Sequence, residues 1–223
     1  RRGPKPQPVS ADVKRILQHG AVIGKRFWTT ALAALSGGPV DETPLLDAIR
    51  RGLIFDCDER GLEGGRSYEF RHSLMRNVAY GGVPKGERLR LHDTFAGWLE
   101  GVARDRVGEY ADTIAYHAEQ AFGLARELGS PRAAALGQRA YALLLAAATR
   151  ARRRADRNSA QALYARAAAS GEAAGKPLGE RVEAEGFAAL SGYYVDGTAE
   201  ALARLDRAIE AARAAGPSEV LVR

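Results

Sequence analysis

The chain has 223 residues, of which 46% are hydrophobic and 27% charged, and its formal net charge is +6. This length allows one large or two small domains with a buried core, and no apolar run is long enough to predict a membrane span. The single cysteine, Cys57, excludes an internal disulfide and a cysteine-cluster metal site, and it favours a cytoplasmic protein.

The basic charge gives only mild support for a nucleic-acid partner. Residues 1–104 carry 17 basic and 12 acidic side chains, and two of the basic ones, Arg1 and Arg2, lie in residues 1–9. We interpret residues 1–9, which are proline-rich and have no apolar core, as a linker from an upstream domain and not as a secretory signal.

Residues 10–83 begin with two short predicted helices. Ser10 is expected to cap the first, which Gly20 is expected to end. The second opens at Thr29 or Thr30 and runs to Leu35, before Gly37-Gly38-Pro39 breaks the chain. The apolar stripe of the first helix consists of Val13, Ile16 and Leu17.

A third helix and a β-hairpin complete this region. Asp41 or Glu42 is expected to cap the helix, and two β-prone segments, 53–59 and 67–71, flank a glycine-rich turn. Three helices followed by a hairpin predict a winged helix. The inner face of the third helix is expected to contain Leu45, Leu46 and Ile49.

A winged helix commonly binds DNA through its third helix, which makes DNA binding the alternative function. Arg50 and Arg51 at the far end of this helix are then the candidate contacts. The helix opens with Asp41 and Glu42, however, and these carboxylates would be repelled by the phosphate backbone. The favoured interpretation is a winged helix that packs against a domain of its own protein.

The segment from Gly20 to Arg26, GAVIGKR, has a superficial likeness to a phosphate-binding loop. Only three residues separate its glycines, and Arg26 stands where the loop needs a serine or threonine. We therefore interpret the segment as a helix end and a turn, without nucleotide-binding function.

The stretch FRHSLMRNVAYGGVPKGERLRLHDTFAGWLE, residues 70–100, resembles the exit from the winged helix of bacterial signal-transducing STAND/AAA-type ATPases. These include nucleotide-cyclase-linked ATPases and large LuxR-like transcription regulators. AVIGKRFW, residues 21–28, is similar to the segment that opens this domain in the cyclase-linked group. The resemblance covers residues 12–170 and implies a regulatory region of a multidomain, ATP-dependent signalling protein.

The resemblance also implies a role for one histidine. In these ATPases a methionine-histidine-aspartate motif follows the last strand, and its histidine contacts the β-phosphate of ADP. Here the matching residue is His72, with Arg71 and Arg76 nearby to add positive charge, whereas Ser73 replaces the aspartate. ATP or ADP would bind an upstream ATPase domain. The alternative is that His72 caps its helix or packs in the joint between strand and helix.

No other pattern predicts chemistry in this chain. His19, His92 and His117 lie far apart on different predicted helices, so neither a metal site nor a bound cofactor is expected. No nucleophile and base occur in a recognisable frame. We expect a non-catalytic region; a free-standing enzyme is the remaining rival.

The pattern after Pro84 is helical to the end. Residues 84–130 are expected to form connecting helices, and residues 131–223 a tetratricopeptide-like array that is truncated at its carboxyl end. Such an array presents a surface for a protein or effector. The positions that match the repeat are Leu144, Ala148, Ala160, Tyr164 and Ala167, and in a second unit Ala201, Leu205 and Ala208.

A dense group of arginines marks the end of one predicted helix in this array. It suits an acidic partner, although complementation of the helix dipole is the simpler interpretation. The group consists of Arg150, Arg152, Arg153 and Arg154.

Overall fold

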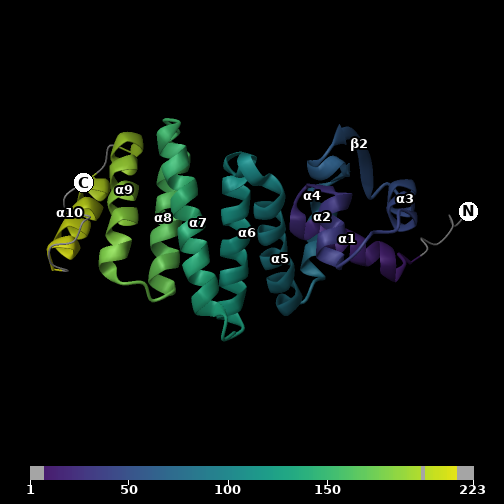
Figure 1. Cartoon of the computed structure of the whole chain (residues 1–223), viewed down its shortest axis with the longest axis horizontal. Helices are drawn as coiled ribbons and strands as arrows, with labels where there is room; N and C mark the ends of the chain where they lie inside the picture. Colours follow the sequence, from purple (N-terminus) through teal and green to yellow (C-terminus); the bar gives the residue numbers. More distant parts are fainter. Residues whose placement is uncertain (1–7, 197–198, 215–223) are drawn as a thin grey trace, which may run out of the picture. The chain divides into compact units, whose positions relative to one another are not determined.

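The computed structural model describes residues 8–196 and 199–214. This part of the chain is mainly helical, with ten α-helices and one three-stranded antiparallel sheet, so the predicted fold class is confirmed at this level. The chain divides into two compact units, Arg1–Ala103 and Arg104–Arg223 (Figure 1). None of the described helices combines the length and apolar character that a bilayer crossing requires.

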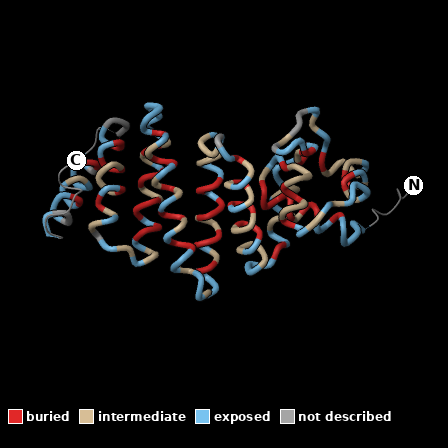
Figure 2. The backbone as a smooth tube through the Cα atoms, in the orientation of Figure 1, coloured by how far each residue is buried: buried red, intermediate tan, exposed pale blue. Residues whose placement is uncertain are grey.

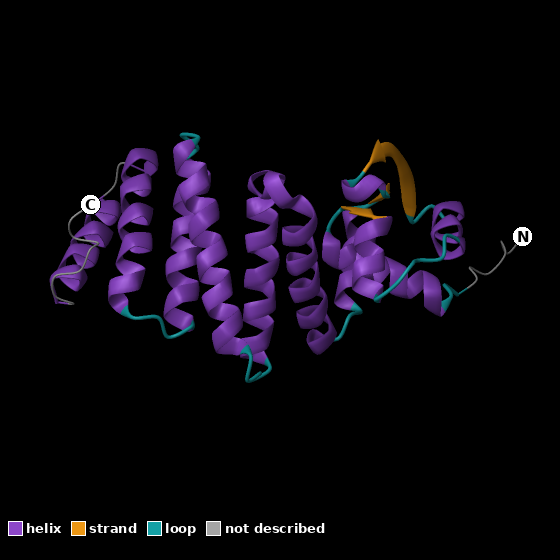
Figure 3. Ribbon diagram, in the orientation of Figure 1, coloured by secondary structure: helices purple, strands orange, loops and turns teal. Residues whose placement is uncertain are grey.

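The first unit contains five helices around a small sheet (Figure 3). It includes the long helix α5, which the sequence analysis grouped with the connecting helices. In chain order the elements are α1 (Ala11–Ile23), β1 (Arg26–Trp28), α2 (Thr29–Ser36), α3 (Thr43–Arg50), β2 (Ile54–Arg60), the 3₁₀ turn η1 (Leu62–Gly64), β3 (Arg66–Phe70), α4 (Ser73–Gly81) and α5 (Lys85–Ala103).

Helix α1 begins as predicted but ends later. The Ser10 hydroxyl accepts a hydrogen bond from the Val13 amide at 3.3 Å. Gly20 does not end the helix, which continues to Ile23, so that prediction is wrong. A Cβ at Gly20 would lie 3.0 Å from the Phe27 ring. Gly20 thus lets the ring pack directly against the helix backbone.

The sheet has the strand order β1-β3-β2 and is antiparallel throughout. The predicted hairpin is present as β2 and β3, in a register that pairs Ile54 with Phe70. Strand β1, which pairs Arg26 with Glu69, was not predicted. Only the middle residue of β1, Phe27, is buried, and such a short strand gives no alternating pattern to recognise.

Aromatic and branched side chains fill the core of the first unit. Phe27 lies between Tyr68 and Phe70, with ring centroids 5.9 and 5.3 Å away. Leu45 of α3 is buried as predicted, but Leu46 is 46% exposed, so its predicted place on the inner face is wrong. The other large side chains buried here include Leu32, Leu35, Ile54, Leu91, Phe95 and Leu99.

The tip of the β2–β3 hairpin is packed onto the body of the first unit. Gly61 lies against the indole of Trp28, and a Cβ there would approach that ring to 1.9 Å. The Arg66 amide donates to Thr29 Oγ1 at 3.1 Å. Because these contacts hold both sides of the turn, the hairpin does not extend freely into solvent.

The second unit is an array of helices in which each contacts the next along the chain. Small residues line the contacts, and buried positions form stripes along the helices (Figure 2). Every matched position of the first predicted repeat is buried. The helices are α6 (Val107–Glu127), α7 (Ala133–Arg153), α8 (Arg157–Ala173), α9 (Leu178–Asp196) and α10 (Ala199–Ala214).

Two glycines in this array provide a matched test of its packing. A Cβ at Gly137 would come within 2.6 Å of Phe122 and Ala174, whereas a Cβ at Gly123 would meet nothing within 4 Å. We expect Gly137→Ala to lower the free energy of unfolding by about 1–3 kcal/mol through overpacking. Gly123→Ala should instead raise it by up to about 1 kcal/mol. Urea unfolding checks both, and equal effects would contradict the packing described.

Candidate functional site

Helix α4 lies on the surface of the first unit, with none of its nine residues fully buried. It follows β3 directly, so the end of the sheet fixes where it begins. The Arg71 amide donates to the Leu53 carbonyl at 3.1 Å and holds this junction against the start of β2. The predicted site residues therefore lie at the exposed amino end of α4, and the hydrogen bond to Leu53 fixes the position of this end.

His72 is the N-cap residue of α4 and is exposed. Its backbone is extended (φ −137°, ψ 140°), and its side chain makes no capping hydrogen bond. Within the described part of the chain, the His72 imidazole therefore neither caps the helix nor packs in the joint between strand and helix. It stands at the positive end of the helix dipole, where an anion is favoured.

Arg71 and Arg76, the two arginines near His72, differ in the contacts that they already make. Arg71 is exposed beside His72. Arg76 is half-buried, and its Nε donates to the Ala21 carbonyl at 3.1 Å, which ties α4 to the end of α1. Arg71 is therefore the better placed of the two to accompany His72 at an anion.

Two apolar side chains on α4 form an exposed ridge that the sequence analysis did not predict. Leu74 and Val78 are 69% and 68% exposed and, four residues apart, share one face of the helix. Their spacing is equally typical of a core stripe, so the pattern alone could not separate the two cases. Residues 71–86, which include the ridge of Leu74 and Val78, contain three basic residues and no acidic one.

A polar joint connects the end of α4 to α5. Tyr80 Oη and His92 Nε2 are 3.0 Å apart, and the Arg88 guanidinium lies over the Tyr80 ring. Arg88 also donates to the carbonyls of Val83 and Gly81 at 2.8 and 3.0 Å. His92 is only 1% exposed, so the position of α4 is set by contacts that reach into the core.

Because His92 is buried, it makes the free energy of unfolding depend on pH. Desolvation, with smaller contributions from Arg76 and Arg88, lowers its pKa from 6.5 to about 4. The unfolded chain therefore binds more protons between these values, and stability falls as the pH falls through this range. We expect a loss of about 2 kcal/mol between pH 6.5 and about 5, where most carboxylates remain ionised.

Urea unfolding at a series of pH values measures this loss. His92→Gln keeps a polar partner for Tyr80 and should reduce the slope above about pH 5, with the buried His19 contributing to the slope that is left. An unchanged slope in this variant would assign the pH dependence to other groups.

The segment from Gly20 to Arg26 has no phosphate-loop geometry. Its first four residues belong to α1, and the Gly24 amide donates to the Gly20 carbonyl. Arg26 is in β1 and lies 3.4 Å from Glu69. The interpretation as a helix end and a turn is confirmed.

The candidate DNA contacts share one carboxylate. Arg51 Nε donates to Asp47 at 2.8 Å, and Arg50 lies 3.6 Å from the same side chain. At the opposite end of α3, Asp41 Oδ1 accepts from the Thr43 amide. The charges on this helix thus offer little free positive potential to a phosphate backbone.

The arginine group of the second unit lies at the end of α7 as predicted, but its members have different surroundings. The Arg150 guanidinium packs against Gly108, where a Cβ would approach it to 1.9 Å. Arg152 lies over the Phe187 ring at 4.5 Å and donates to Tyr164 Oη. Arg153 and Arg154 are exposed, and among the described residues neither side chain makes a hydrogen bond or ion pair with another element.

No group of three or more histidine, cysteine, aspartate or glutamate residues in the described ranges is arranged to hold a metal ion. Comparison with family models, curated proteins and solved structures found no match to this chain.

Proposed function

We propose that this chain is a regulatory region of an ATP-dependent signalling protein of the STAND type. It relays the nucleotide state of an ATPase domain on the same polypeptide to helical repeats that bind a protein or effector. The chain itself does not catalyse a reaction. The alternative is a transcription regulator that binds DNA through the first unit.

The order of elements supports a winged helix in the first unit. The sequence α1-β1-α2-α3-β2-β3, with β1 added to the hairpin as a third strand, is compatible with such a domain. In the second unit, burial of the small residues Ala160 and Ala167 and of the large Tyr164 supports tetratricopeptide-like packing. The second predicted repeat agrees in part, since Ala201 and Ala208 on α10 are also buried.

The surface of α4 is the observation that carries the proposal. An exposed His72 at a helix amino terminus and an exposed Leu74–Val78 ridge occur on one nine-residue helix. Neighbouring exposed apolar side chains of this kind would be buried favourably if another domain covered them. Contact with a nucleotide-binding domain would cover the ridge and bring His72 to a phosphate.

DNA binding is the less favoured function because the arginines and the hairpin tip that it would use already contact other residues of this chain. Asp47 holds both candidate arginines, and the hairpin tip is packed on Trp28. Duplex binding that weakens with salt and disappears in the Arg50→Ala/Arg51→Ala variant would restore this function.

The coding sequence upstream of Arg1 tests the proposal. We expect it to encode a domain with a phosphate-binding loop, the glycine-rich turn that ends in lysine and serine or threonine. A start codon immediately before Arg1 would contradict the proposal.

A further inference from the structure

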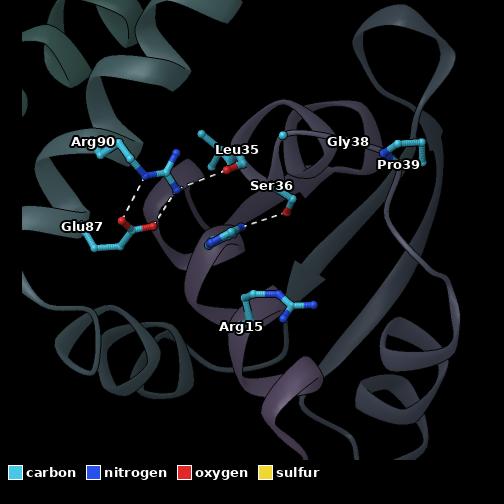
Figure 4. Close-up of a pocket in the computed structure, with 9 residues that line it drawn as sticks. Arg15, Leu35, Ser36, Gly38, Pro39, Glu87 and Arg90 are labelled. Carbon is cyan, nitrogen blue, oxygen red and sulfur yellow. Dashed lines mark hydrogen bonds and ion pairs between the residues drawn. The ribbon is translucent and has the colours of Figure 1, made fainter.

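A cavity of about 460 Å³ opens between α1, the end of α2 and the start of α5 (Figure 4). It lies within the first unit. Its walls come from Arg15 and His19 on one helix turn of α1, from the segment Leu35–Pro39, and from Glu87 and Arg90 on α5. This volume is in the range of small-molecule sites.

The glycine turn leaves one side of the cavity open. Gly37 has a φ of 76°, which favours glycine, and neither Gly37 nor Gly38 would place a Cβ within 4 Å of another atom. A ligand can therefore approach the backbone here without meeting a side chain.

The Arg90 guanidinium is held rigidly at the wall. Its Nε and Nη2 donate to Glu87 at 3.0 and 2.6 Å, and Nη2 also donates to the Leu35 carbonyl at 3.3 Å. Nη1 has no partner among the described residues and keeps both hydrogens for a ligand. Because the side chain is already ordered, a ligand that binds it loses little further entropy.

Two more polar side chains face the same space. Within the described ranges Arg15 is paired only through Nη2, which lies 2.9 Å from Asp12, and both side chains are 60% exposed. His19 is 7% exposed, and its Nδ1 lies 3.1 Å from Ser36 Oγ. Its Nε2 has no hydrogen-bond partner in the described part of the chain.

We propose that this cavity binds the carboxylate group of a small organic molecule. The two guanidinium groups are offset by Glu87 in the wall and by Asp12 beside Arg15, so the site has little net charge and suits a singly charged ligand better than a doubly charged phosphate. The site goes beyond the proposed function, because it places an effector on the first unit and not on the repeats. Since the cavity lies within this chain, the site does not depend on an upstream domain.

The His19 ring signals in NMR spectra of this chain report on binding. The probes are acetate, pyruvate and benzoate, each compared with its neutral amide at constant ionic strength. At least one carboxylate should shift the His19 signals saturably, with a dissociation constant on the order of 1 mM or tighter. The amides should not.

Arginine variants assign the binding to this cavity. Arg15→Gln and Arg90→Lys should each weaken binding about tenfold, since each removes a charged or forked donor. Arg50→Gln is the control, because Arg50 is 71% exposed and lies on α3 outside the cavity. Unchanged affinity in both cavity variants, equal binding of the amides, or no saturable shift with any probe would overturn the proposal.

The pH dependence gives a second readout. Burial lowers the pKa of His19, which faces Glu87 and Arg90 from α5, Arg15 from its own helix and Ser36 from α2. A bound carboxylate favours the protonated imidazole, so affinity should increase as the pH falls below 6.5. His19→Gln, in which binding is followed by calorimetry because the His19 signals are lost, should remove this increase. An increase that persists in His19→Gln would exclude His19 from the site.

Discussion

If an ATPase domain precedes this chain as proposed, replacing His72 by alanine should accelerate ADP release from the longer polypeptide by about 10–100-fold. The exposed imidazole at the amino end of α4 is the donor that the proposal places against an ADP phosphate. A hydrogen bond to a charged group contributes about 1.5–3 kcal/mol, which corresponds to this change in rate. Stopped-flow release of a fluorescent ADP analogue measures it.

Two further variants separate this role from a general effect on α4. Asn77→Ala changes an exposed polar residue on the same helix and should leave ADP release unchanged. His72→Gln retains a donor and should lie between wild type and His72→Ala. ADP release that is the same in His72→Ala as in the wild type would remove His72 from the nucleotide site.

Replacing Phe27 by alanine lowers the free energy of unfolding of the first unit by about 3–5 kcal/mol. The ring is fully buried between Tyr68 and Phe70 and covers the backbone of α1 at Gly20. Its loss removes apolar burial and leaves a cavity where the sheet meets α1. Chemical unfolding followed by tryptophan fluorescence measures the change, because Trp28 is the next residue.

Phe55→Ala is the matched control for Phe27→Ala. Phe55 is in the same sheet, on β2, but is 37% exposed. Its replacement should cost about 1 kcal/mol or less. Equal losses in the two variants would show that Phe27 is not the centre of this core.

The sequence correctly predicted those elements whose signals come from residues close together in the chain. The Ser10 cap, the glycine break after α2 and the two strands of the hairpin all depend on residues close in the chain. The third strand was missed because three residues carry no period, and its partner β3 is about 40 residues away. Gly20 was read as a helix end because its contact with Phe27 cannot be seen without the fold.

In the candidate site too, the sequence predicted what depends on neighbouring residues and missed what depends on the fold. The sequence predicted that His72 lies where a strand gives way to a helix, and the structure places it there. It did not predict the exposed ridge, because apolar residues at a spacing of four indicate a face without saying whether that face is covered. The cavity at Arg90 was missed for a related reason, since its walls come from three helices distant in sequence.

The accessibility of Leu74 to a chemical label tests the central claim most directly. A Leu74→Cys variant, with Cys57→Ser to remove the native thiol, should react rapidly with a maleimide in this chain alone, because Leu74 is 69% exposed. In an ADP-bound polypeptide that includes the proposed upstream ATPase domain, labelling should slow at least about tenfold. Leu128→Cys, at a 47% exposed position in the second unit, is the control and should react equally in both. Equal labelling of Leu74→Cys in the two proteins would show that α4 is not the docking surface.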